Sequence, residues 1–317
     1  MVDIIQIDRK SAVLKPSSLA CLSHIPTINL TSGCAHGCLY CYARGYSIHP
    51  GENKVVLYKN ILEKLKKELT RKQAKPRAIY FSPSSDIFQP ISEVLELCHI
   101  ILEFLLTEGI GVAFVTKGHI PDKTMNLLLS HPDKVRAQIG IITLNEDIWR
   151  IFEPNTANPN IRIEQMARMV AGGIATEARI IPILPGLTDD SVTLDHLFRS
   201  ITNAGIRSAA ISTLFLRQAI AESLKRGISD QTMLETLLDF YKGVRRLATH
   251  AVNSSVAALP LPKREEIYAR MKQIARKYFM GLSICACMNT DMDCGTCNIT
   301  GRWPASNIQR SLFDLGG

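Results

Sequence analysis

The chain has 317 residues, 46% of them hydrophobic, and its 37 Lys and Arg outnumber its 29 Asp and Glu to give a formal net charge of +8. No run approaches 18 apolar positions, which argues against a membrane span. No basic stretch leads into an apolar run near the N-terminus, which argues against a signal peptide. A cytoplasmic protein without a membrane partner is therefore expected. The length allows a full core, and the basic charge permits a nucleic-acid partner without establishing one.

Six apolar, β-rich runs follow one another and predict strands at 27–32, 77–82, 111–116, 135–143, 178–185 and 207–215. Amphipathic stretches between them predict helices, the first with a face made by Leu57, Ile61, Leu62, Leu65 and Leu69, and the others at 91–107, 121–130, 161–172 and 190–203. Alternating strands and helices favour a parallel sheet with right-handed crossovers. The alternation alone does not separate a doubly wound sheet from a complete or partial barrel.

After residue 216 the pattern predicts helices only, at 230–248 and 263–279, and then a cysteine-rich segment and a polar tail. We therefore expect one catalytic domain with a metal-binding extension. The predicted parts are an N-terminal segment (1–25), the catalytic domain (26–216), a helical extension (217–280), a four-cysteine segment (281–303) and a flexible tail (304–317).

Nine cysteines are an odd number for a secreted disulfide framework, and seven of them fall into two tight groups, a distribution typical of metal binding. Only Cys21 and Cys98 stand apart from the two groups. Cys98 lies within an apolar run, so we interpret it as a small buried hydrophobic residue.

The first group, CAHGCLYC at 34–41, places Cys34, Cys38 and Cys41 in a C-x3-C-x2-C spacing directly after the first predicted strand. Three thiolates so close together can bind three irons of one 4Fe-4S cluster if the chain wraps tightly, and Gly33 and Gly37 permit that turn. The fourth iron is then free to bind S-adenosylmethionine (SAM). Zinc is less suited to this group, because a closed zinc site usually needs four ligands. A disulfide is also less suited, because it would leave the third cysteine unpaired.

This motif, with an aromatic residue before its last cysteine, resembles the radical SAM superfamily. The segments CYARG, SSDIFQP, VTKG, FEPNT, IRIEQM and IIPILPGLTDD, in that order, resemble the spore photoproduct lyase-like family within it. The resemblance implies an α/β fold, a partial (β/α)6 TIM-type barrel. It also implies SAM reduced by one electron to a 5′-deoxyadenosyl radical, and a reductant such as flavodoxin or ferredoxin.

The resemblance also implies roles for individual residues. Tyr40 packs near the adenine, the backbone of Ser82, Ser84 and Ser85 meets the methionine amine, and Lys117 pairs with the methionine carboxylate. Thr143 is the candidate for a ribose hydroxyl, Arg162 for supporting the carboxylate or the helix that carries it, and the backbone around Ile183 for adenine. Tyr40 and Tyr42 are candidate catalytic relay groups, with aromatic packing as the alternative for both. His36 is interpreted as a supporting or exposed residue.

One departure from the family stands at Pro83-Ser84-Ser85-Asp86. Spore photoproduct lyase carries a hydrogen-donating cysteine immediately before a Thr-Ser-Asp stretch, and no cysteine precedes the corresponding stretch here. A relay that returns hydrogen through that thiol cannot operate at this position. The resemblance therefore predicts a relative of the lyase with a different reaction or a different donor.

The second group comprises Cys285, Cys287, Cys294 and Cys297 in a C-x-C-x6-C-x2-C arrangement. Four thiolates in so short a segment predict metal binding. Both a second 4Fe-4S cluster, which the superfamily often adds in C-terminal extensions, and a closed zinc site accept four thiolates.

The final residues contain Gln309-Arg310-Ser311-Leu312-Phe313, which fits the peptides that dock bacterial DNA enzymes on the sliding clamp. The alternative is a short helix end whose Leu312 and Phe313 pack on the parent fold. Together with the basic charge and the lyase-like motifs, this segment favours a radical SAM enzyme that repairs or modifies a DNA base, by a lyase-like or hydrogen-abstracting reaction. The alternatives are a peptide, RNA or metabolite substrate, or a non-catalytic iron–sulfur adaptor.

Overall fold

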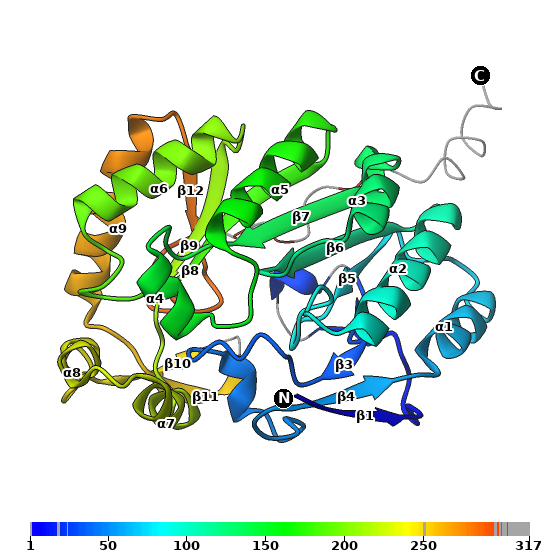
Figure 1. The fold of residues 1–317 in the computed structure, drawn as a ribbon, viewed down its shortest axis with the longest axis horizontal. Helices are drawn as coiled ribbons and strands as arrows, with labels where there is room; N and C mark the ends of the chain where they lie inside the picture. The colour runs from blue at the N-terminus through cyan, green and yellow to red at the C-terminus, as the bar shows by residue number, and fades with distance from the viewer. Residues whose placement is uncertain are drawn as a thin grey trace.

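The computed structural model describes residues 2–17, 20–23, 25–249, 252–294, 297, 299 and 303. Its main sheet has the strand order β12-β9-β8-β7-β6-β5-β2, and every neighbouring pair is parallel (Figure 1). The strands are β2 (Thr27–Ile28), β5 (Ala78–Phe81), β6 (Gly111–Thr116), β7 (Val135–Gly140), β8 (Ala175–Ile183), β9 (Ser208–Thr213) and β12 (Gly281–Ile284). Five of the six predicted strands are confirmed as β5 to β9. The first, predicted at 27–32, is divided between β2 of this sheet and β3 (Thr31–Ser32) of a second sheet, and β12 is a strand that was not predicted.

Helices cover one side of this sheet in an arc (Figure 1). They are α1 (Ile61–Thr70), α2 (Ser92–Thr107), α3 (Asp122–Leu129), α4 (Glu146–Phe152), α5 (Pro159–Ala171), α6 (Ser191–Asn203) and α9 (Leu261–Arg276), with short 3-10 turns η1 (Ala20–Leu22), η2 (Tyr42–Gly45) and η3 (Pro132–Lys134). The inner strands are buried on both faces because helices cover one face and loops and the C-terminal segment cover the other, which explains their continuous apolar runs.

Side-chain caps fix where the helices after the central strands begin. Asn145 accepts hydrogen bonds at the start of α4, Asn158 at the start of α5 and Asp190 at the start of α6. Because these caps follow the carboxyl ends of parallel strands, they hold the connecting loops at the edge where α/β proteins build their sites.

A small second sheet includes the last residues of the first predicted strand. It has the order β1-β4-β3 and consists of β1 (Asp3–Ile7), β4 (Lys54–Tyr58) and β3 (Thr31–Ser32). The assignment of Leu57 to the first helical face is wrong, because Leu57 lies in β4 and the helix begins at Ile61.

The helices-only pattern predicted after residue 216 is also wrong. The helices α7 (Gln218–Gly227) and α8 (Gln231–Asp239) are followed by an antiparallel pair, β10 (Arg246–Thr249) and β11 (Val252–Ala257), and α9 leads directly into β12. None of the helices in the described ranges is both long and apolar enough to cross a membrane. The segment Gln309–Phe313 lies outside the described residues, so its docking on a sliding clamp stays a prediction.

Candidate active site

The first cysteine group lies on the loop between β3 and η2, so the strand that precedes it sets its position. Gly33 opens this loop with φ of +80°, and a Cβ there would lie 2.4 Å from the backbone oxygen of Lys54. A side chain at this position would therefore meet both backbone strain and a steric clash. The three cysteines are partly exposed and form no disulfide.

Side chains from distant segments hold the backbone of this loop. The amide of Ala35 donates to Gln89 Oε1 at 2.9 Å, and the carbonyl of Ala35 accepts from Asn155 Nδ2 at 3.1 Å. The carbonyl of Cys38 accepts from Arg44 Nε at 3.2 Å. Together with backbone hydrogen bonds such as that from Leu39 N to Phe152 O at 3.0 Å, these side chains satisfy the polar groups of the loop and fix its shape.

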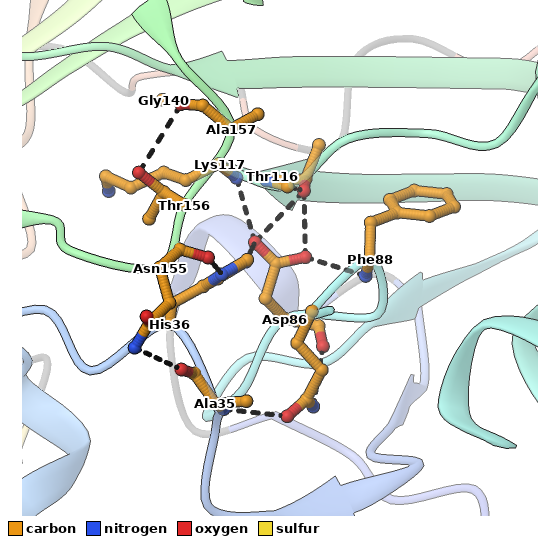
Figure 2. Close-up of polar contacts among 12 residues, drawn as sticks. Ala35, His36, Asp86, Phe88, Thr116, Lys117, Gly140, Asn155, Thr156 and Ala157 are labelled. Carbon is orange, nitrogen blue, oxygen red and sulfur yellow. Dashed lines mark hydrogen bonds and ion pairs between the residues drawn. The ribbon is translucent and has the colours of Figure 1, made fainter. Parts of the chain in front are cut away.

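Beneath the loop, His36 and Asp86 form a buried pair (Figure 2). His36 contacts Asn155 O through Nδ1 at 2.9 Å and Asp86 Oδ2 through Nε2 at 3.1 Å. Asp86 also accepts from Thr116 Oγ1 and from the backbone amide of Lys117, each at 2.8 Å. Burial alone would raise the pKa of Asp86, but His36 and these donors outweigh burial and lower it. The ionised carboxylate thus ties the cluster loop to the end of β6.

A second buried network begins at Tyr40, whose hydroxyl donates to Glu153. Arg162 Nη2 donates to the other oxygen of Glu153 at 2.6 Å, and its remaining donors bond the carbonyls of Ala157 (2.8 Å) and Gly140 (2.7 Å). Burial opposes the charge of Glu153, but Arg162 prevails and the pKa of Glu153 is lowered. Arg162 is therefore a positioning residue that fastens the loop after α4 to β7.

Lys117 lies across Gly140, where a Cβ would come within 2.7 Å of the Lys117 side chain. Its Nζ is 5.5 Å from the centre of the Tyr40 ring, and its charge acts on Cys38 and Glu153. Among the described residues no carboxylate or carbonyl accepts a hydrogen bond from this Nζ. The ammonium thus faces the cluster loop with donors available to a ligand.

The stretch after β5 supplies further polar groups. Ser82 adopts φ of +52°, and the hydroxyls of Ser82 and Ser85 are buried without a partner in the described part of the chain. Ser84 donates to Asn29 Oδ1 at 2.9 Å. Backbone strain and unpartnered buried hydroxyls together are typical of a site shaped for a ligand.

The remaining expected SAM contacts are occupied by the protein itself. Thr143 Oγ1 accepts from Asn145 N at 3.0 Å, and the carbonyl of Ile183 accepts from Leu214 N at 2.9 Å. Ile183 follows the cis bond between Ile181 and Pro182. A ribose contact at Thr143 and an adenine contact at Ile183 stay predictions.

Tyr42, directly after the third cysteine, is 47% exposed, while its hydroxyl donates to Pro83 O. Its ring meets Tyr46 edge-to-face, with centroids 5.8 Å apart, and Arg217 lies 5.9 Å from the Tyr46 centroid. Burial around the hydroxyl raises the pKa of Tyr42 well above its usual value. The hydroxyl is thus a neutral donor on a residue that is nearly half exposed.

The sequence did not single out Gln89, Asn155, Asp86 or Glu153, which support the loop from below. The signal was available, because all four lie within the segments SSDIFQP and FEPNT that carried the resemblance. The second cysteine group is divided: Cys285, Cys287 and Cys297 come together, Cys294 does not join them, and Cys21 does. Cys98 is fully buried, as predicted.

The site as described is a three-cysteine loop at the edge of a partial parallel barrel, and a family comparison agrees with it. The model of the radical SAM superfamily matches residues 28–198. The chain belongs to the radical SAM superfamily. Membership implies catalysis with a 4Fe-4S cluster and SAM.

Solved structures show the same fold. Spore photoproduct lyase complexed with dinucleoside spore photoproduct superposes with a TM-score of 0.66 at 16% identity, over 89% of this chain and 81% of that one. A radical SAM methyltransferase from Sphaerobacter thermophilus gives a TM-score of 0.52 at 15% identity, over 82% and 66% of the two chains.

Two curated relatives match over part of their length. An uncharacterized protein of Mycobacterium tuberculosis is 27% identical over 217 residues, 66% of this chain and 64% of the relative. A radical SAM Nα-GlyT isomerase of Pseudomonas phage M6 is 26% identical over 174 residues, 54% of this chain and 35% of the relative.

The described residues fit the cofactors that the superfamily implies. Cys34, Cys38 and Cys41 would hold the cluster, the unpartnered hydroxyls of Ser82 and Ser85 stand where the methionine amine is expected, and the Lys117 ammonium would pair with the carboxylate. When bound, the cluster and SAM supply a 5′-deoxyadenosyl radical. The chain's own contribution is to fix the loop through Gln89, Asn155 and Asp86 and to keep the surroundings buried.

Proposed function

We propose that this radical SAM enzyme acts on a nucleobase of DNA. The observation that carries the proposal is the group formed by Tyr42, Tyr46 and Arg217 beside Cys41. Exposed aromatic faces stack nucleobases, and an arginine beside them pairs with phosphate. Tyr42 immediately follows a cluster ligand, so a base stacked on it would lie next to the reacting atoms.

The hydrogen bond to Pro83 O gives the Tyr42 ring a fixed orientation. Pro83 belongs to the stretch after β5 that is expected to meet the methionine amine. The ring therefore spans the distance between the cluster loop and the SAM-binding stretch. A base that reaches this position must leave the duplex stack, as in other enzymes that react with bases.

Two further observations support a nucleic-acid substrate. The formal net charge is +8, and the fold resembles that of spore photoproduct lyase bound to a dinucleoside photoproduct. The chain departs from the lyase at one position, since Pro83 stands where the donor thiol is expected, and we therefore propose a different reaction or a different donor. The Tyr42 hydroxyl is the nearest phenol to that position and is our candidate relay group.

The experiment measures the 5′-deoxyadenosine that the anaerobically reconstituted protein releases from SAM. Dithionite serves as the one-electron reductant in place of flavodoxin or ferredoxin. Parallel reactions contain no nucleic acid, intact duplex DNA, UV-irradiated duplex DNA, or RNA. DNA-stimulated release, followed by mass analysis of digested nucleosides, supports the proposal and defines the reaction class. Release that only RNA stimulates, or that no nucleic acid changes, overturns the DNA substrate and directs the search to RNA or to peptides and metabolites. No release from fully loaded protein favours the adaptor.

Variants test the role of Tyr42. The Tyr42→Ala protein should keep its iron content but lose DNA stimulation, whereas Tyr42→Phe keeps the stacking face and should lose only a relay through the hydroxyl. Phe279→Ala is the matched control, because Phe279 is an aromatic residue that is 90% exposed and outside the site. Full DNA stimulation in Tyr42→Ala would contradict the proposed stacking role.

A further inference from the structure

Four cysteine sulfurs from opposite ends of the chain meet in one cluster. Cys21 Sγ lies 3.5 Å from Cys287 Sγ. Cys287 also contacts Cys285, Cys285 contacts Cys297, and Cys297 contacts Cys21. Each sulfur therefore touches two others in a closed ring of four, and none of them is in a disulfide.

The cluster lies on the inner face of the sheet, among apolar residues of β5, β6 and β9. Cys285 and Cys297 are each only 4% exposed. Arg179 on β8 directs Nη1 to Cys297 Sγ at 3.9 Å, and Gln138 donates to the Cys297 carbonyl at 3.2 Å. A cation beside buried sulfurs suits thiolates, whose charge would otherwise be costly to bury.

Cys294 belongs to a different environment. Its Sγ donates to Asn289 O at 3.8 Å, and the charged groups around it are Asp293, Lys272, Arg264 and Asp291. No cysteine is among these described neighbours. Proximity in sequence therefore groups Cys294 with the other three C-terminal cysteines, whereas the fold replaces it with Cys21.

We infer that Cys21, Cys285, Cys287 and Cys297 bind one tetrahedral divalent metal ion of the zinc type. Four thiolates around zinc lie about 3.8 Å apart, given a zinc–sulfur distance of about 2.3 Å and tetrahedral angles. The contact between Cys21 and Cys287 is within a few tenths of an ångström of that value. In a 4Fe-4S cluster each thiolate binds a different corner, which keeps the ligand sulfurs out of contact with one another.

In the described residues no three His, Cys, Asp or Glu side chains already stand in a finished metal-binding arrangement, and this includes Cys34, Cys38 and Cys41. The four-sulfur cluster is therefore inferred from the contacts among its sulfurs, of which the one between Cys21 and Cys287 is 3.5 Å long.

The position of the ligands gives the ion a structural task. Cys285 directly follows β12, and its amide donates to Ile211 O at 3.0 Å, so it continues one edge of the sheet. Cys21 lies in η1, which leads into β2 at the other edge. One ion bound to both cysteines would join the two edges of the open barrel.

The test uses the full chain with Cys34, Cys38 and Cys41 replaced by alanine, so that no 4Fe-4S cluster bound at these three cysteines contributes metal. Elemental analysis should give about one zinc per chain and no iron or sulfide. Adding Cys21→Ser should abolish zinc binding, and adding Cys294→Ser, the matched control, should leave it unchanged. Four iron and four sulfide per chain, loss of metal with Cys294→Ser, or no metal at all would each overturn the inference.

If the Cys21→Ser protein fails to fold, a second variant with a spectroscopic readout still tests whether residue 21 is a ligand. Cobalt(II) in a four-thiolate site gives intense visible and near-ultraviolet absorption, and Cys21→His keeps a ligand at this position. The histidine variant should retain one cobalt with a weaker sulfur-to-metal charge-transfer band. A cobalt spectrum identical to that of the protein with Cys21 intact would show that residue 21 is not a ligand.

Discussion

Tyr40 donates its hydroxyl hydrogen bond to the carboxylate of Glu153, a residue 113 positions further along the chain. The other oxygen of Glu153 accepts from Arg162, so an aromatic residue of the cluster motif is joined through one buried carboxylate to α5. This chain of contacts ties the three-cysteine loop to α5 through the protein's own side chains.

Arg162→Met should lower the free energy of unfolding of the apoprotein by roughly 3–5 kcal/mol, because Glu153 would stay buried without its cation. Arg150→Met is the matched control. Its partner Glu146 is 48% exposed and Arg150 itself 63%, so that pair should contribute only about 0–1 kcal/mol. Urea unfolding measures both variants, and equal losses would contradict the assigned role.

Glu153 also predicts a pH dependence. Its pKa is lowered in the folded protein, so its contribution to stability is present above the unfolded value of about 4.3 and disappears as the pH falls through the folded value. Glu153→Gln should therefore be less stable than the parent at pH 7 but lose less stability on acidification. Unfolding curves of the two proteins between pH 3 and 7 provide the comparison. Asp86 contributes equally to both proteins, so the difference between their stability–pH curves reports on Glu153. Parallel stability–pH curves would refute the effect of Glu153.

Lys117→Met should weaken SAM binding to the reconstituted protein by roughly 10- to 150-fold, the value of one charge-assisted contact. Iron content should not change, since Lys117 is not a cluster ligand. Equilibrium binding of SAM measures the effect. Lys123→Met, on the exposed face of α3 beside Glu96, should bind SAM normally; an equal loss in both variants would remove the specific role of Lys117.

Gly33→Ala should reduce the iron retained per chain and destabilise the apoprotein by more than the strain of a positive φ alone, which is about 1–3 kcal/mol. The extra loss comes from the backbone oxygen of Lys54, 2.4 Å from the new Cβ. Gly243→Ala isolates the strain, because Gly243 has φ of +67° and nothing within 4 Å of an added Cβ. Iron analysis and urea midpoints that match between the two variants would rule out the steric contribution.

The sequence predicted the elements whose signal is local. The six central strands are continuous apolar runs, and the cluster loop is defined by spacing within eight residues. The first helical face failed because Leu57 and Ile61 match a helical period across a junction between β4 and α1. The small sheet and the β10–β11 pair were missed, because their strands are only two to six residues long and a period is hard to recognise over so few positions.

The supporting polar residues could not be derived from local pattern at all. Gln89 and Asn155 act on the loop from 54 and 120 positions away, and a single amide side chain carries no periodicity. Cys21 was set apart for the same reason, since its partner Cys287 is 266 positions distant. Only the resemblance in ordered segments pointed toward the first two, and nothing in the sequence pointed toward Cys21.

The contact between Cys21 and Cys287 also affects how the protein is made. A ribosome adding roughly 5–20 residues per second would take roughly 13 to 53 s to advance the 266 positions from Cys21 to Cys287. During that time Cys21 is a thiol without its final cysteine neighbours. The thiol of Cys21 is therefore exposed to oxidation until residue 287 has been added.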